Sequence, residues 1–240
     1  MINIENIGAS SHDKIIISQT FGRETGFLAG ATRLFDKDRK KPIIILLPED
    51  IKSINFIIES IEKKLLSFDR CLVIISEGYH IGDIGSVLDA SGQNMYGSCK
   101  STAAQLLVDK LISNGIQARA YIPTILQRQD IESTMKFDSD IAFLQGAYII
   151  DQFSKGNSHF LASINKDNIM NNIEDLISSI PFNTFSDFSR NMHESFIDHD
   201  KFDVTDLYID YLENILKLSI NNAEKYGFSS NKFLSKLKNI

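Results

Sequence analysis

Short apolar runs alternate with amphipathic segments along most of the chain. The apolar runs are rich in isoleucine, leucine and valine and are bounded by proline, glycine or charged residues, which is typical of buried strands. They cover residues 14–19, 42–49, 70–75 and 117–122. Strands without a polar face occur in parallel sheets that helices cover on both sides, so the pattern predicts such a sheet.

The segments between the strands repeat their apolar residues with a helical period. Over 51–68, for example, Ile54, Ile57, Ile61 and Leu65 fall on one face. Further helices are predicted over 27–35, 100–115, 138–156 and 205–227. The alternation predicts an α/β fold, a parallel sheet with helices on both faces, followed by a helical C-terminal tail.

Composition limits the classes of partner. The 240 residues carry a net charge of -6, which argues against nucleic acid because binding to phosphate backbones needs a basic face. No apolar run approaches the roughly 20 residues of a membrane helix, so we expect no membrane association. The chain has two cysteines, Cys71 and Cys99, and no secretory signal at its start, so we expect a reducing, cytoplasmic location.

Charged residues follow the predicted strands. Gly22 and Arg23 come after the first strand, Glu77 ends the third, and Arg128 lies in the loop after the strand that contains Arg119. Ligands of parallel sheets bind at the carboxyl ends of the strands. Guanidinium groups grip phosphate oxygens, and a carboxylate accepts hydrogen bonds from hydroxyl groups, so this set suits a phosphorylated polyol.

Each of these residues also has a purely structural interpretation. A Gly22–Arg23 pair can form a turn with a surface ion pair, Glu77 can cap a turn, and Arg119 can pair with a surface acid. The histidines show neither a catalytic triad nor the spacing of a metal site, so we predict no catalytic residue and no metal ligand among the motifs of this chain.

Several segments, in order, resemble the C-terminal half of the 6-phosphofructokinases and are most similar to the pyrophosphate-dependent branch. FGRETGFLAGATRL (21–34) resembles that family's MGRxTGF segment, VIISEG (73–78) its VxSEG, and RAYIPTILQR (119–128) its strand and loop ending in QR. DSDIAFLQGAYII (138–150) resembles its DxxEAxxxGxxAV helix. The matching segments follow the order of the family over residues 10–156, and from there to residue 212 the matches are scattered.

The resemblance implies an activity and a substrate site. The family transfers a phosphoryl group from ATP or pyrophosphate to fructose 6-phosphate in glycolysis, with Mg²⁺. By similarity, Gly22 and Arg23 contact the sugar phosphate, Glu77 accepts hydrogen bonds from the sugar hydroxyls, and Arg128 grips the 6-phosphate. Fructose 6-phosphate, or a related sugar phosphate, is therefore the expected ligand.

Two further cations complete the implied site from another subunit. Arg119 corresponds to an arginine that reaches the phosphate of a neighbouring subunit, and Lys14 stands where the family often has a second such arginine. The resemblance therefore implies a homo- or hetero-oligomer. The sequence departs from the family pattern at Phe21, Ile125 and Gln93, which replace a methionine, a polar or aromatic residue and a histidine, so the identity of the sugar stays open.

The family's Gly-Gly-Asp donor loop and its TxDND segment, which carries the catalytic base and helps to hold Mg²⁺, do not occur in these residues. We therefore expect a sugar-phosphate-binding α/β domain over 1–128, a segment over 129–180 that would pack on a missing N-terminal domain, and a helical tail over 181–240. The missing half would supply most of the residues that bind Mg²⁺, and the chain alone would be inactive. A non-catalytic regulatory subunit paired with a full-length paralogue, or a decayed fragment, are the alternatives.

Overall fold

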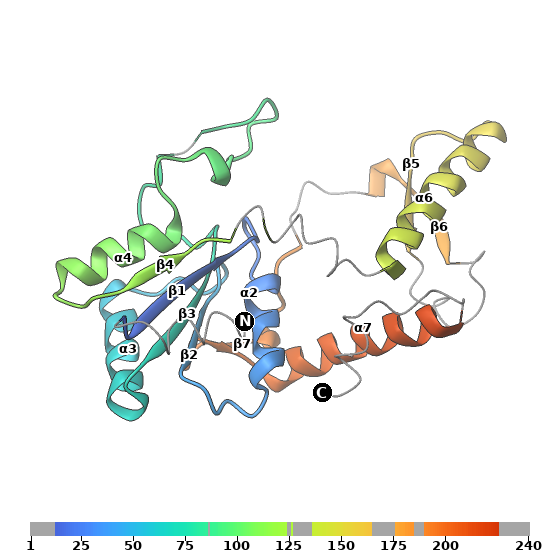
Figure 1. Ribbon diagram of the computed structural model, residues 1–240. Coiled ribbons are helices and arrows are strands. Elements are labelled where there is room, and N and C mark those ends of the chain that lie inside the picture. The colour runs from blue at the N-terminus through green and yellow to red at the C-terminus, as the bar shows by residue number, and fades with distance from the viewer. Residues whose placement is uncertain are drawn as a thin grey trace. The chain divides into compact units, whose positions relative to one another are not determined.

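The computed structural model describes residues 13–85, 87–123, 126, 136–164, 176–184 and 190–225. The chain forms two compact units, each described by itself below (Figure 1). The first comprises Met1–Arg128 and Ser189–Tyr211, and the second Gln129–Phe188 and Leu212–Ile240.

A four-stranded parallel sheet forms the centre of the first unit (Figure 1). Its strands are β1 (Ile15–Thr20), β2 (Ile43–Leu46), β3 (Cys71–Ser76) and β4 (Arg119–Tyr121). They lie in the order β2-β3-β1-β4, and each neighbouring pair is parallel. The register pairs Thr20 with Ser76, so β1 and β3 end at the same edge. The predicted parallel sheet is confirmed.

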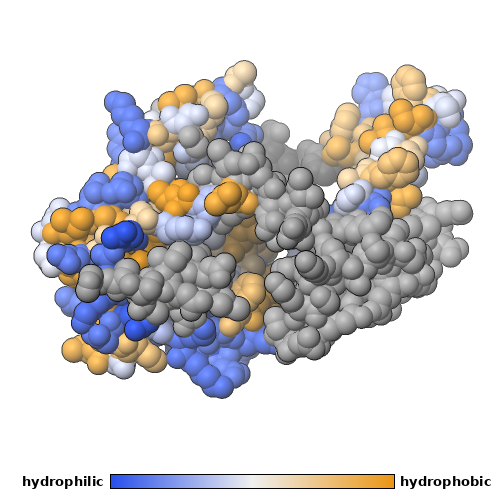
Figure 2. Space-filling model, viewed as in Figure 1, coloured by the Kyte–Doolittle hydropathy of each residue, from blue (hydrophilic) through white to orange (hydrophobic). Residues whose placement is uncertain are grey.

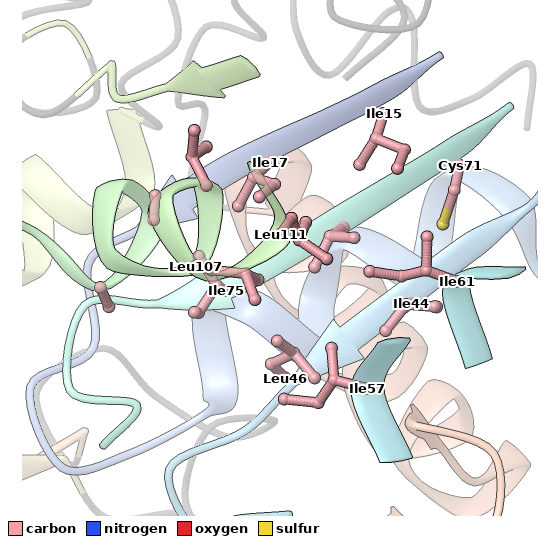
Figure 3. Packing of buried hydrophobic residues seen from close by; sticks show 14 of the residues in the cluster. Ile15, Ile17, Ile44, Leu46, Ile57, Ile61, Cys71, Ile75, Leu107 and Leu111 are labelled. Carbon is pink, nitrogen blue, oxygen red and sulfur yellow. The ribbon is translucent and has the colours of Figure 1, made fainter. Parts of the chain in front are cut away.

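Helices α3 (Ile54–Phe68) and α4 (Ala103–Ser113) cover one face of this sheet. Each begins after a side chain that caps it: Ser53 accepts a hydrogen bond from the amide of Phe56, and Thr102 from that of Gln105. Figure 3 shows the core between the strands and these helices. Alternate strand residues meet the apolar faces of both helices there, among them Ile15, Ile17, Leu46, Ile57, Ile61, Ile75, Leu107 and Leu111.

The other face carries α2 (Phe27–Ala31), which is followed by the 3-10 helix η1 (Thr32–Asp36), while the segment that begins near residue 190 lies beside the edge strand β2, where the Ile45 amide donates to the Phe202 carbonyl at 2.8 Å. This later segment holds the antiparallel pair β7 (Ile197–Asp198) and β8 (Asp203–Val204) and the start of α7 (Asp206–Lys225). A Cβ on Gly30 would lie 2.9 Å from both Tyr208 and Val204, so the glycine allows this close packing. The Tyr208 hydroxyl donates to the Phe27 carbonyl at 2.7 Å. Helices therefore lie on both faces, as the sequence predicted.

A buried ionic network fastens the later segment to η1. The Arg33 side chain is 1% exposed, and its guanidinium lies 2.8 Å from both Asp36 Oδ2 and Asp203 Oδ2. Asp36 also accepts hydrogen bonds from the amides of Lys40 and Lys41. Because these charges satisfy one another, the burial of Arg33 is tolerated.

The second unit contains α6 (Lys136–Ser154) and the antiparallel strands β5 (Phe160–Ile164) and β6 (Ile177–Pro181). Ile141 of α6 packs with Leu176 and Ile177. The Gln145 side chain donates to the Ala162 carbonyl at 2.9 Å. Apolar side chains remain exposed on α6: Phe143 at 77%, Ile150 at 69% and Phe153 at 73%. In the space-filling view, orange atoms are visible on the part of the molecule that α6 occupies in Figure 1 (Figure 2).

Short 3-10 helices complete the described elements: η2 (Tyr96–Ser98), η6 (Phe182–Thr184) and η7 (Glu194–Phe196). Among the described residues, no helix combines the length and apolarity needed to cross a membrane.

Candidate functional site

The turn after β1 is closed around Gly22. The Thr25 amide donates to the Gly22 carbonyl at 2.7 Å, and the Ser76 hydroxyl donates to the same oxygen at 3.2 Å. Gly22 has φ of 141°, and a Cβ there would overlap the carbonyl oxygen of Thr25. The turn therefore needs a glycine at this position, directly beside the arginine that the sequence singled out.

The Glu77 carboxylate lies against the same turn. Glu77 follows β3, is 8% exposed, and its amide donates to the Thr20 carbonyl at 2.9 Å. Its Oε1 atom accepts from the amide of Gly22 at 3.4 Å and from that of Arg23 at 3.3 Å. These contacts are long for N–H···O bonds, and a carboxylate has about four acceptor positions. Glu77 therefore caps the turn and retains capacity for ligand hydroxyls.

Arg23 extends from this turn to a neighbouring loop. Its side chain is exposed, and Nη1 donates to Oε1 of Gln93. The turn of residues 20–26 thus brings together a guanidinium, a buried carboxylate and backbone amides. Gly22, Arg23 and Glu77 form one cluster, as expected from the shared edge of β1 and β3.

Lys14 and Arg119 lie at the opposite edge of the sheet. Lys14 precedes β1 and pairs with Asp69, while Arg119 begins β4, opposite Ile16. The Arg119 Nε atom lies 2.6 Å from Asp13 Oδ2, so the alternative interpretation, a surface ion pair, is observed. A six-residue strand spans about 20 Å, so one chain does not bring these cations to Gly22.

Arg128, together with Gln127 and Ile125, lies outside the described residues. The strand that leads toward it is described: β4 runs parallel to β1 and pairs Tyr121 with Ser18. The loop after β4 therefore leaves the sheet at the edge that carries Gly22 and Glu77. The role of Arg128 stays a prediction.

Two polar residues that the sequence did not point to lie beside this cluster. Glu49 lies three residues after the end of β2 and accepts with Oε1 from the amides of Gly26 and Met192, both at 3.0 Å. It thereby joins the start of α2 to the segment that begins near residue 190. Thr20, at the end of β1, buries a hydroxyl that has no hydrogen-bond partner among the described residues. Only their position after or at the end of a strand could have indicated them.

Among the residues that the structure describes, no three histidine, cysteine or carboxylate side chains lie together in a way that could hold a metal ion. Phosphoryl transfer depends on a metal ion and on a residue that orients the nucleophile. The cluster itself offers a guanidinium and a carboxylate with spare acceptor positions, which are groups that can bind an anion that carries hydroxyl groups.

Several known sugar kinases are similar in sequence to this chain. No family model matches the chain. A sulfofructose kinase from Alkalicoccus urumqiensis is 25% identical over 227 residues, which are 91% of this chain and 56% of that protein. An ATP-dependent 6-phosphofructokinase from Synechocystis sp. is 25% identical over 175 residues, 71% of this chain and 46% of that protein.

The fold also matches solved structures. A pyrophosphate-dependent phosphofructokinase from Nitrosospira multiformis superposes with a TM-score of 0.65 at 22% identity. The match covers 89% of this chain and 50% of that one. The chain thus spans about half the length of the curated relatives it matches. The resemblance to phosphofructokinases, pyrophosphate-dependent ones included, is confirmed, and this coverage is consistent with a C-terminal half.

Proposed function

We propose that this chain supplies the sugar-binding side of a phosphofructokinase-type kinase, which transfers a phosphoryl group from ATP or pyrophosphate to fructose 6-phosphate or a related ketose. One observation supports this above the others: Glu77 holds the amides of Gly22 and Arg23 at the carboxyl ends of two adjacent parallel strands. The carboxylate would accept hydrogen bonds from sugar hydroxyls, and the Arg23 guanidinium would bind the anionic group. Arg128, in the loop after β4, would be a second guanidinium that binds the anionic group.

A sulfonated ketose is a second candidate acceptor. The sulfofructose kinase relative matches 91% of this chain, and Phe21 and Gln93 depart from the phosphofructokinase pattern. A sulfonate carries one negative charge at all relevant pH values, whereas a phosphate monoester gains its second charge near pH 6. Affinity for fructose 6-phosphate should therefore rise between pH 5.5 and 7.5, while affinity for a sulfonated fructose should stay level.

The positions of Lys14 and Arg119 support an oligomer as the working form. These cations stand at the edge of the sheet that is remote from Glu77, so within one chain they have no route to the same ligand. In a dimer of suitable symmetry, each chain would present them to the site of its partner. Sedimentation analysis in the presence of fructose 6-phosphate tests this, and a monomer at saturating ligand would contradict it.

The donor site, the general base and the Mg²⁺ ligands would come from a segment outside these 240 residues. This division is proposed because the sequence holds no Gly-Gly-Asp loop or TxDND segment. The exposed apolar face of α6, with Phe143, Ile150 and Phe153, also suggests that the 129–180 segment packs against another part of the enzyme.

Calorimetry on the full chain tests the binding role. Fructose 6-phosphate should bind, and Arg23→Ala should weaken binding by roughly 1.5–3 kcal/mol, the range for a hydrogen bond to a charged group. Lys63→Ala, which removes an exposed cation from α3, is the control and should leave binding unchanged. Equal affinities of both variants would remove Arg23 from the site.

An activity assay tests whether the donor site lies outside this chain. The chain alone, with fructose 6-phosphate, Mg²⁺ and either ATP or pyrophosphate, should show no turnover. Turnover would contradict the proposal that the donor site lies elsewhere. Co-purification with a full-length paralogue would instead favour a regulatory subunit, whereas aggregation without sugar binding would favour a decayed fragment.

A further inference from the structure

The loop between β3 and α4 contains a well-defined turn beside the candidate site. The Asp89 Oδ1 atom accepts hydrogen bonds from the amides of Ser91 and Gln93, both at 2.9 Å, and from the Ser91 hydroxyl at 2.6 Å. The Asp89 amide donates back to the Gln93 carbonyl at 2.8 Å. Gly92, with φ of 81°, closes the turn. The backbone of Gln93 is therefore fixed by Asp89.

This turn, residues 89–93, meets Arg23. Nη1 of Arg23 donates to the side-chain amide oxygen of Gln93, 70 residues away in the sequence. The pKa of Asp89 is lowered by the hydrogen bonds from Ser91 and Gln93 and, to a smaller extent, by the charge of Arg23. The turn thus lies within the electrostatic reach of the guanidinium.

We propose that Gln93 is a positioning and specificity-determining residue that holds the guanidinium of Arg23 for the anionic group of the ligand without neutralising it. An amide oxygen fixes the direction of a guanidinium but carries no charge, so this hydrogen bond does not itself reduce the attraction of Arg23 for an anion. A carboxylate at the same place would hold Arg23 more strongly and would compete with the ligand. The identity of the sugar in this inference rests on the proposed function, whereas the binding of an anion at Arg23 does not.

Two isosteric variants separate the effects of shape, hydrogen bonding and charge. Gln93→Glu keeps the size and the acceptor and adds a negative charge, which should weaken binding of fructose 6-phosphate roughly tenfold through repulsion. Gln93→Met keeps the length and removes the acceptor, so it should weaken binding less, by a few-fold. Lys63→Gln changes the net charge by the same amount at an exposed position on α3 and should leave binding unchanged.

Thermal unfolding distinguishes this role from a merely structural one. Gln93→Glu should retain or raise the melting temperature, because a charged acceptor strengthens the bond to Arg23, while its affinity for anions falls. The loss should shrink at high salt, since repulsion between exposed charges is screened. A variant that loses affinity only in proportion to a loss of stability would overturn the proposal.

Calorimetry with fructose 6-phosphate and, separately, with inorganic phosphate keeps the two proposals distinguishable. If the sugar phosphate binds and Gln93→Glu matches Lys63→Gln, the role of Gln93 is refuted and the proposed function stands. If inorganic phosphate binds and depends on Gln93 while no sugar phosphate binds, the role of Gln93 stands and the proposed function fails. Binding of neither ligand by the unmodified chain overturns both.

Discussion

Gly78 lies directly against the backbone of Arg23, so close that a Cβ on Gly78 would stand within covalent-bond distance of the Arg23 carbonyl oxygen. Gly78 follows Glu77 at the end of β3, and Arg23 follows the turn at the end of β1. The two strand ends therefore fit together only because one of them has no side chain at this point. This contact fixes the Arg23 backbone beside the Glu77 carboxylate.

Gly78→Ala should accordingly displace the turn that carries Arg23. Because the obstacle is backbone, we expect destabilisation of about 1–3 kcal/mol in urea unfolding, together with loss of sugar-phosphate binding. Gly146→Ala in α6 is the control. Nothing lies within 4 Å of its added methyl group, and alanine favours a helix, so stability should stay equal or rise by about 0.5–1 kcal/mol. Similar results for the two variants would show that the contact is not tight.

The buried network of Arg33, Asp36 and Asp203 should contribute strongly to stability. Asp203→Ala leaves Arg33, at 1% exposure, without one of its partners, so we expect a loss of about 3–5 kcal/mol in the free energy of unfolding. Asp151→Ala breaks the exposed pair with Lys155 and should cost less than about 1 kcal/mol. Equal losses would mean that Arg33 is reached by water or by another acceptor.

The two cysteines should differ in reactivity. Burial raises the pKa of Cys71 to about 12, whereas Cys99 is partly exposed. Because only the thiolate reacts, an aromatic disulfide reagent should titrate one thiol in the native protein and two after denaturation. Cys99→Ser should abolish the fast native reaction. Persistence of a fast thiol in that variant would contradict the burial of Cys71.

His199 should make stability depend on pH. Its Nδ1 atom lies 2.7 Å from Asp50 and its Nε2 atom 2.9 Å from Glu194, and these hydrogen bonds, that of Asp50 first, raise its pKa. Lys52, 2.7 Å from Asp50, is the nearby opposing charge. A raised histidine pKa means that the stabilisation is complete below about pH 6.5 and is lost as the pH rises through the higher folded-state value.

The test for His199 is the difference in unfolding free energy between the unmodified chain and His199→Gln. It should be larger at pH 6 than at pH 9. The side chain is 41% exposed, so screening by water limits the difference to about 1 kcal/mol or less. A difference that stays constant over this range would show that the histidine does not charge in these contacts.

Arg128→Ala should weaken binding of fructose 6-phosphate by roughly 1.5–3 kcal/mol if the loop after β4 reaches the ligand. Titration calorimetry measures this, with Lys63→Ala again as the control. Unchanged affinity would remove Arg128 from the proposed site and leave Arg23 as its principal cation.

Much of the sheet, and the cluster of Gly22, Arg23 and Glu77 at the carboxyl ends of its strands, could be predicted from the sequence. The isoleucine-rich runs gave the strands because a residue buried on both faces of a sheet must be apolar wherever it points. Gly22, Arg23 and Glu77 could be placed together because parallel strands share their carboxyl edge. Arg119 was harder to interpret, since it begins its strand and so belongs to the other edge, where it pairs with Asp13.

What the chain by itself determined was thus local: which segments form strands and helices, and which residues end them. Only the tertiary structure decided which distant residues meet, such as Arg33 with Asp203, Glu49 with Met192 and Arg23 with Gln93. The physical reason is that the hydrophobic period of a segment shows that one of its faces is buried, but not which other segment packs on that face. Two-residue strands such as β7 and β8 are too short to show any period at all.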